Sequence, residues 1–242
     1  MPRPLQPSSE GTGASCVIAV CGMASEAAIA SGAGVVTLCG LGSGRLAMRL
    51  EELVMREGKR CRGIISFGTA GGLDPALPSG TCVVADAIAA PDRRFPVEST
   101  WQSALHACLP QAIRGTLAGT DRPVLDAADK ARLRASSGAC AVDMESHHSA
   151  RIAQRFGLPF AACRVIVDPA QRSLPPAAVA GLRDDGRIAL MRILRSLIRH
   201  PGQLPKLMQL TADAGAAKRT LRTVRLRTGL AFAMPLQQRK SC

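Results

Sequence analysis

Aromatic side chains are almost absent from this 242-residue sequence, which has no tyrosine, one tryptophan and five phenylalanines. Proteins that bind single-stranded nucleic acid need aromatic side chains on which the bases stack, so this composition argues against a nucleic acid partner. Acidic residues are also scarce, because 18 Asp and Glu stand against 31 Lys and Arg, for a formal net charge of +13. The excess positive charge favours a phosphate-bearing ligand, an anionic membrane surface or an acidic partner.

The sequence also lacks the paired cysteines of a metal site and an uninterrupted apolar run long enough to cross a membrane. No two of the nine cysteines form a CxxC pair, so we expect reduced core cysteines in a cytoplasmic protein. Segment 1–15 lacks the charged and then apolar order of a secretory signal and is expected to be disordered. Polar residues and glycines interrupt the apolar stretch 17–41, which favours strand, helix and strand over a membrane span.

The rest of the sequence alternates short apolar strands with helices. Strands are expected at 17–21, 35–39, 63–67, 81–85, 140–142 and 160–167, and helices at 24–30, 45–57 and 144–156. Segment 91–125 is rich in turn-forming residues and is left unassigned. The alternation predicts an α/β domain with a buried and largely parallel sheet, whose ligand would bind at the carboxyl ends of the strands.

The last quarter of the chain carries most of the positive charge. Residues 183–240 hold 13 basic and three acidic side chains, a net of 13 − 3 = +10. Their spacing predicts basic amphipathic helices, which could dock on an anionic membrane or pack on the domain with solvated charges. We therefore expect a globular domain at 16–182, a basic helical extension at 183–228 and a flexible tail at 229–242.

Four features near expected strand ends could carry chemistry, and each has an ordinary structural explanation. Residues 68–72, GTAGG, could bring backbone N–H groups close to an anion or form a plain turn. Glu26 and Glu145 could act as carboxylates in a site or simply favour the first turn of a helix. Asp168 could be a general acid or a turn former before a proline.

Taken together, these features resemble a known family. The segments are CGMASEA at 21–27, ISFGTAGGLDPALPSGTCVVAD at 65–86, AVDMES at 141–146 and PFAACRVIVD at 159–168. They resemble the purine nucleoside phosphorylase and uridine phosphorylase superfamily, and within it the methylthioadenosine/S-adenosylhomocysteine nucleosidase branch. The resemblance implies a three-layer α/β fold with a central mixed sheet, here with C-terminal basic amphipathic helices added. It also implies an enzyme that cleaves the N-glycosidic bond of a nucleoside.

The resemblance implies roles for residues on the nucleophile side of such a site. Glu26 would activate the attacking water, and Gly68 and Thr69 would lie beside the nucleophile. The loop at 43–45, which comprises Ser43, Gly44 and Arg45, would complete a nucleophile or phosphate site. Arg45 is the one candidate cation for phosphate, and a carboxylate at Glu26 would repel that anion. We therefore favour hydrolysis over phosphorolysis, with phosphate kept as the alternative co-substrate.

Further roles follow on the sugar and base side. Met144 would pack under the ribose, and Glu145 would bind its 2′ and 3′ hydroxyls. Asp168 would protonate or hydrogen-bond N7 of a leaving adenine, with Arg164 in support. Val167 departs from the nucleosidase pattern, because that branch usually has at this position a hydroxyl that orients the acid. The orientation of Asp168 is therefore the open point of this assignment.

The basic C-terminal segment is similar to hopanoid-associated members of the superfamily. This resemblance implies an adenine nucleoside linked to lipid, adenosylhopane, as substrate, and a cytoplasmic enzyme peripheral to the inner membrane face. The alternatives are a soluble methylthioadenosine/S-adenosylhomocysteine-type nucleosidase and a non-catalytic protein of the membrane surface. No cofactor and no metal is implied, since the adjacent His147 and His148 should point about 100° apart on a helix. A homodimer is left open.

Overall fold

A computed structural model describes residues 14–40, 44–174, 202 and 204–235, and its centre is one sheet of eight strands. The strand order is β2-β1-β3-β7-β6-β4-β5, with β8 paired to β3 and β4. The strands are β1 (Cys16–Cys21), β2 (Val35–Cys39), β3 (Cys61–Gly72), β4 (Cys82–Ala89), β5 (Arg94–Pro96), β6 (Ile113–Gly119), β7 (Ala141–Asp143) and β8 (Phe160–Asp168). Five of the eight pairings are parallel and three are antiparallel, so the sheet is mixed.

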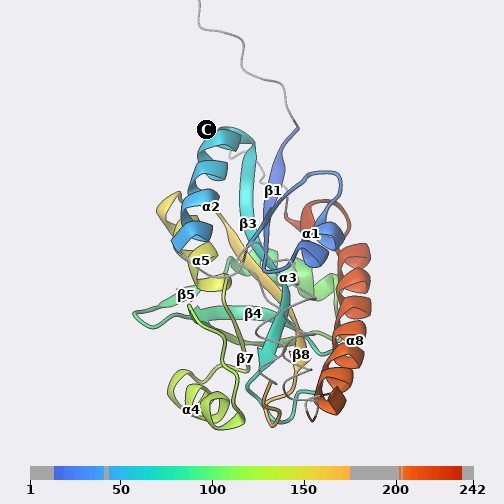
Figure 1. The fold of residues 1–242 in the computed structure, drawn as a ribbon. Coiled ribbons are helices and arrows are strands. Elements are labelled where there is room, and N and C mark those ends of the chain that lie inside the picture. Colours follow the sequence, from blue (N-terminus) through green and yellow to red (C-terminus); the bar gives the residue numbers. More distant parts are fainter. Residues whose placement is uncertain (1–13, 41–43, 175–201, 203, 236–242) are drawn as a thin grey trace, which may run out of the picture.

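Helices cover both faces of this sheet. They are α1 (Ala24–Ala30), α2 (Gly44–Glu57), α3 (Ser99–Cys108), α4 (Ala127–Ser137), α5 (Ser146–Arg155) and α8 (Leu204–Thr228), with 3-10 turns η1 (Gly58–Arg60) and η3 (Leu230–Ala233). Helices α2 and α5 pack on one face, and α1, α3 and α8 pack on the other, as Figure 1 shows. The expected three-layer α/β fold with a central mixed sheet is confirmed.

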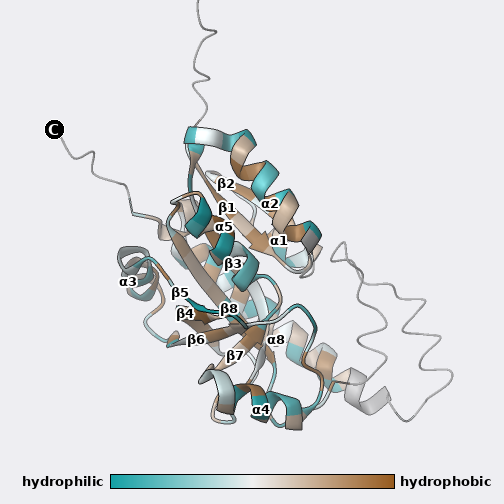
Figure 2. Ribbon diagram, turned by 90° about the vertical axis from the view of Figure 1, so that its left-hand side faces the viewer, coloured by the Kyte–Doolittle hydropathy of each residue, from teal (hydrophilic) through white to brown (hydrophobic). Residues whose placement is uncertain are grey.

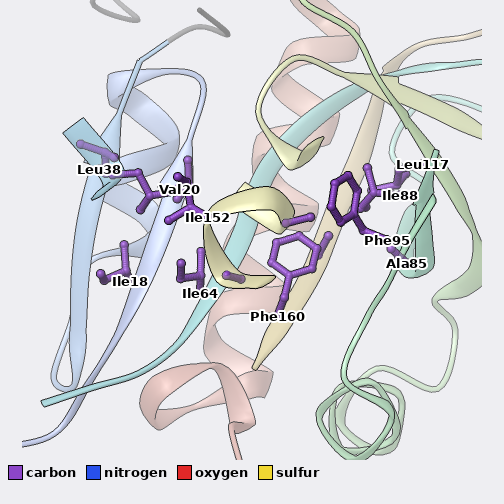
Figure 3. Packing of buried hydrophobic residues seen from close by; sticks show 14 of the residues in the cluster. Ile18, Val20, Leu38, Ile64, Ala85, Ile88, Phe95, Leu117, Ile152 and Phe160 are labelled. Carbon is purple, nitrogen blue, oxygen red and sulfur yellow. The ribbon is translucent and has the colours of Figure 1, made fainter. Parts of the chain in front are cut away.

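Each strand supplies side chains to two separate cores because successive residues point to opposite faces. In β1, Ile18 and Val20 join the core under α2 and α5, whereas Val17 and Ala19 join the core under α1, α3 and α8. Figure 3 shows the first core, in which Ile152 of α5 lies among strand residues. In Figure 2 the strands are largely hydrophobic, while α2 alternates between hydrophobic and hydrophilic turns. This pattern fixes which face of the sheet each helix covers.

The structure changes three of the expected boundaries. Residues 68–72 were expected to form a loop, but they are the end of the 12-residue strand β3 and pair with β8 and β7. Segment 91–125, left unassigned, contains β5, α3 and β6. The helix expected from Met144 begins at Ser146, so Glu145 precedes it as the N-cap residue. A Cβ atom at Gly71 or Gly72 would lie 3.2–3.4 Å from its neighbours, so the structure packs tightly around these two glycines.

The described part of the basic segment packs on the domain. Ala217, Leu221 and Val224 of α8 are buried on the core, while Arg219 and Arg222 are exposed. The helix is therefore amphipathic and belongs to the third layer. The first expected basic helix and the boundary at 182/183 lie outside the described residues.

Residues 229–235 differ from the flexible tail expected there. Phe232 in η3 is fully buried, and its ring centroid lies 5.0 Å from that of Phe67. Its carbonyl oxygen accepts a hydrogen bond of 2.8 Å from the indole of Trp101. The buried ring and the hydrogen-bonded carbonyl hold this turn against the core.

Two composition-based expectations can be compared with the described residues. None of the eight cysteines among them forms a disulfide, and four of the eight are buried. Within the same residues, no helix combines the length and hydrophobicity that crossing a membrane would require.

Candidate active site

Glu26 lies in the first turn of α1 and is held by neutral donors. Its Oε2 accepts hydrogen bonds from the backbone N–H groups of Gly22 and Met23, at 3.1 and 3.0 Å. Its Oε1 accepts from the backbone N–H and the hydroxyl of Thr69, at 2.9 and 2.7 Å. The side chain is buried, and these four donors join the end of β1 to the end of β3.

Arg164 of β8 lies at the centre of a buried charge network. Its Nε lies 2.7 Å from Asp143 Oδ2, and its Nη2 lies 3.1 Å from Glu145 Oε2. The guanidinium also donates to the carbonyl of Thr69 and to the hydroxyl of Ser66. Burial opposes the charged form, but the surrounding carboxylates outweigh it and raise the pKa of Arg164. A permanently charged guanidinium therefore binds the carboxylates together.

Glu145 is brought into this cluster by the short strand β7 and the start of α5. Its carboxylate is 3% exposed and pairs with Arg164, and Met144 beside it is half-buried. Asp143 stabilises the turn because its carboxylate accepts from the backbone N–H and hydroxyl of Ser146. The VDMES segment therefore places two carboxylates against Arg164, and one of them, Asp143, also holds the turn into α5.

Asp168 ends β8 and is paired with a lysine. Lys130 of α4 donates a short hydrogen bond to Asp168 Oδ2, and both side chains are buried. Burial raises the pKa of the Asp168 carboxyl above its usual value, while the Lys130 ammonium opposes this rise. The Arg172 guanidinium opposes the rise as well, to a smaller extent, so the protonation of this buried carboxyl depends on two neighbouring cations.

Glu26 and Asp168 each lie against a glycine of β3, which is Gly68 for Glu26 and Gly71 for Asp168. A Cβ atom at Gly68 would fall 2.8 Å from Arg164 Nη1 and closer still to Glu26 Oε2, and Gly68 has a positive φ of 151°. A Cβ at Gly71 would fall 3.4 Å from both carboxyl oxygens of Asp168. Since a strand rises about 3.3 Å per residue, these glycines are about 10 Å apart, which a sugar with an attached base can span.

The structure thus brings together most of the residues predicted from the sequence. Glu26, Gly68, Thr69, Glu145 and Arg164 are joined by direct contacts, and Asp168 lies at the same end of β3. These residues lie at or near strand ends, and the end of β3 is on the side of the molecule where α4 lies in Figure 1. Their catalytic roles stay predictions at this point.

The expected nucleophile or phosphate loop at 43–45 is not part of this network. Ser43 lies outside the described residues, and Gly44 begins α2. The side chain of Arg45 is exposed, and among the described residues no hydrogen bond or ion pair joins it to the carboxylates. The carboxylates of Asp143 and Glu145 instead contact Arg164.

The two adjacent histidines do not point apart as expected. Their ring centroids are 3.9 Å apart, and the Nε2 atoms of His147 and His148 lie 3.0 and 3.1 Å from Asp121 Oδ1. The geometric reason given for excluding a shared metal ligand set is therefore wrong, because these three side chains could hold an ion. Hydrogen bonding to Asp121 accounts for the same contacts, and burial lowers the pKa of His148.

Sequence reasoning missed four polar residues of the site. Lys130 lies in an arginine-rich helix that gives no sign of burial, although its side chain is fully buried. Asp143 and Ser146 belong to the VDMES segment itself, so their position next to Glu145 could have identified them. Ser66 is buried, its hydroxyl accepts a hydrogen bond from Arg164, and it lies 2.9 Å from the hydroxyl of Ser146.

Comparisons with known proteins agree with this fold. A family model described as the phosphorylase superfamily matches residues 29–199. A futalosine hydrolase structure from Helicobacter pylori superposes with a TM-score of 0.62 at 14% identity, covering 87% of this chain and 97% of that one. A methylthioadenosine/S-adenosylhomocysteine nucleosidase from Neisseria meningitidis, in complex with methylthio-immucillin-A, gives 0.61 at 18%, covering 87% and 99%. No curated protein matches the chain.

Proposed function

Because the chain belongs to the phosphorylase superfamily, and is thus an enzyme that cleaves nucleoside N-glycosidic bonds, we propose that it hydrolyses an adenine nucleoside. The observation that carries this proposal is the buried cluster of Glu26, Glu145, Asp168 and Arg164 at the ends of β1, β3 and β8. Cleavage builds positive charge on the sugar and negative charge on the base. The carboxylates of Glu26 and Glu145 would face the sugar, where positive charge develops, and Asp168 would give a proton to the base.

The proposed reaction assigns one step to each carboxyl group. The bond between C1′ and N9 breaks, and its electron pair goes to the base while Asp168 gives its proton to N7. Water attacks C1′, and its proton goes to Glu26. Glu145 accepts hydrogen bonds from the ribose 2′ and 3′ hydroxyls, beside Met144. The products are adenine and the free sugar, and one proton has moved from Asp168 to Glu26.

Hydrolysis is favoured over phosphorolysis by the surroundings of Glu26. Phosphate binding usually requires free cationic or N–H donors. Glu26 already accepts four hydrogen bonds from the donors around it, and the Arg164 guanidinium contacts Asp143, Glu145, Ser66 and Thr69. An anion entering here would meet a carboxylate rather than an unoccupied guanidinium.

We propose adenosylhopane, an adenine nucleoside linked to lipid, as the substrate. The sequence resemblance to hopanoid-associated enzymes and the basic surface of α8 support this choice. Arg219, Arg222 and Arg227 are exposed, and Leu226 and Leu230 are 80% and 74% exposed near the end of the helix. Basic residues near an anionic surface contribute about 1 kcal/mol each, so this surface could bring the enzyme to its substrate in a bilayer.

The second candidate is a methylthioadenosine/S-adenosylhomocysteine-type nucleosidase that needs no membrane. The names of the solved structures with similar folds favour it, because they include nucleosidases for these two substrates. The third reading from the sequence, a non-catalytic membrane-surface protein, does not agree with membership of an enzyme superfamily.

An adenine-release assay tests these alternatives. The enzyme is incubated with adenosylhopane in anionic vesicles, in neutral vesicles and with soluble methylthioadenosine, each with and without phosphate. We expect the fastest release from anionic vesicles, no dependence on phosphate and free ribosyl product. A ribose 1-phosphate product with strict phosphate dependence would contradict hydrolysis, and preference for methylthioadenosine would favour the second candidate.

Charge variants of α8 separate membrane docking from catalysis. Replacing Arg219, Arg222 and Arg227 together by Gln should weaken sedimentation with anionic vesicles and slow release from them, but leave release from a soluble nucleoside unchanged. The matched control replaces three exposed arginines on other elements, Arg56, Arg93 and Arg132, by Gln. Equal loss of vesicle binding in both variants would contradict a role for α8 itself.

A further inference from the structure

Lys130 is fully buried, which is unusual for a lysine outside an ion pair or a functional site. Its ammonium group donates to Asp168 Oδ2, to the carbonyl of Pro169 at 3.1 Å and to the carbonyl of Arg172 at 2.8 Å. An ammonium has three N–H donors, so every one of them has an acceptor. The charged form of Lys130 is thus fully satisfied in the interior.

All three acceptors belong to one short segment, the end of β8 and the residues that follow it. The same segment is joined to the start of α4 by two more hydrogen bonds, from the Ala127 N–H to Ser173 Oγ at 3.2 Å and from the Leu174 N–H to the Leu125 carbonyl at 2.8 Å. Among the described residues, the one side-chain hydrogen bond to the Asp168 carboxyl comes from Lys130. It therefore fixes where Asp168 points, while the charges of Lys130 and Arg172 both act on the carboxyl.

Asp168 has no hydroxyl beside it on its own strand to perform this task. The preceding residue is Val167, whose side chain packs against the core under α1, α3 and α8. Gly71, on the opposite side, provides space rather than a hydrogen bond, because a Cβ there would meet both carboxyl oxygens at 3.4 Å. The contact that sets the rotation of the carboxyl group therefore comes from α4.

We propose that Lys130 is a positioning residue of the reaction, which fixes Asp168 Oδ2 so that Oδ1 meets the leaving base. This inference rests on the proposed nucleoside cleavage. Lys130 takes no part in the proton transfer and does not touch the substrate. Its effect is therefore confined to leaving groups that require protonation by Asp168.

The experiment compares two leaving groups in the full-length enzyme. One substrate is adenosine or the preferred adenine nucleoside, and the other is 4-nitrophenyl riboside, whose leaving group departs without protonation. We expect Lys130→Met to lower kcat/KM for adenine release about 10- to 100-fold, less than the 10²–10⁴-fold typical of a general acid. The nitrophenyl riboside should change by less than about threefold on the same reasoning.

The control variant is Arg132→Met on the same helix, whose side chain is 78% exposed. It should leave both activities unchanged. Equal losses of Lys130→Met on both substrates, or no loss on either, would overturn the positioning role. A wild-type enzyme that released no base from any nucleoside would instead overturn the proposed function, so the two failures are distinguishable.

A second comparison keeps the test decisive if Lys130→Met leaves Asp168 as an unpaired charge and does not fold. Asp168→Asn and the double variant Asp168→Asn with Lys130→Met are compared, since the double variant buries no charge at this pair. If Lys130 acts through Asp168, both release adenine at rates within about threefold of each other, as expected for residues that work as one unit. A further tenfold loss in the double variant would show an independent role and overturn the proposal.

Discussion

Glu26 and Asp168 are buried to the same degree, with exposed fractions of 1% and 3%, but their carboxylates are held by different kinds of partner. Glu26 accepts four hydrogen bonds from neutral backbone and hydroxyl donors, three of them backbone N–H groups. Asp168 is fixed by one buried ammonium from a different helix. Neutral donors hold a carboxylate through ordinary hydrogen bonds, whereas an ammonium makes a charge-assisted hydrogen bond.

This difference matches what each group would have to do. A group that takes a proton from water has to lie where the water binds, and four donors fix the position of the Glu26 carboxylate. A group that gives a proton to the base has to start neutral, and burial raises the pKa of Asp168 in that direction. The leaving-group side of the site would thus favour transfer of a proton to the base.

The largest expected effect comes from removing the carboxylate on the nucleophile side. Glu26→Gln should lower kcat for both adenine release and 4-nitrophenyl riboside cleavage by about 10²–10⁴-fold, the range of general base catalysis. Both substrates are affected because water must be activated for either leaving group. A loss confined to the adenine nucleoside would show that Glu26 acts on the base, which would contradict the different roles proposed for Glu26 and Asp168.

A smaller effect is expected from one donor to Glu26. Thr69→Val removes the hydroxyl that lies 2.7 Å from Oε1 but keeps the backbone donor. Because a hydrogen bond to a charged group contributes about 1.5–3 kcal/mol, we expect a loss of about tenfold or somewhat more in kcat/KM. Thr69→Ser, which keeps the hydroxyl, is the matched control and should stay near wild type. Equal losses in the two variants would place the effect in packing rather than in the hydrogen bond.

The carboxylates of the site could be predicted from the sequence, whereas the lysine that holds one of them could not. Glu26, Glu145 and Asp168 lie in short local motifs next to strand ends, and parallel strands end at the same edge of a sheet. Lys130 could not be found in this way, since it lies 38 residues before Asp168 in a helix of mixed charge. Its burial depends on how α4 packs against the segment after β8, a tertiary contact that local patterns do not encode.

The fold, like the site, could be predicted from the sequence only in part. The alternation of strands and helices predicted the layers, and the resemblance gave the mixed sheet. The glycine run at 68–72 was taken for a loop because glycine favours turns, but in the sheet its missing side chains make room for Asp168 and Val142. The turn around Phe232 was equally hidden, because the short apolar run around it does not by itself show where in the fold it packs.

The pH dependence of adenine release tests the leaving-group side. If the neutral carboxyl of Asp168 is the active form, release falls as pH rises through the pKa of Asp168. Lys130 opposes the rise in this pKa that burial causes. Removing the ammonium in Lys130→Met should therefore raise the pKa further and move the alkaline limb of the kcat/KM profile to higher pH. A limb that stays in place or moves to lower pH would contradict the assigned coupling.

The smallest expected effect comes from restoring a hydroxyl next to the acid. Val167→Ser places a donor one residue before Asp168, but in the wild-type background Lys130 already holds Oδ2. We therefore expect less than about a threefold change in adenine release, within the range of one weak neutral hydrogen bond. In the Lys130→Met background the same substitution should recover part of the lost activity, because the carboxyl then lacks a positioning donor. Rates measured for the two single variants and the double variant give this coupling directly. Equal effects of Val167→Ser in both backgrounds would mean that Lys130 and a neighbouring hydroxyl do not share one task.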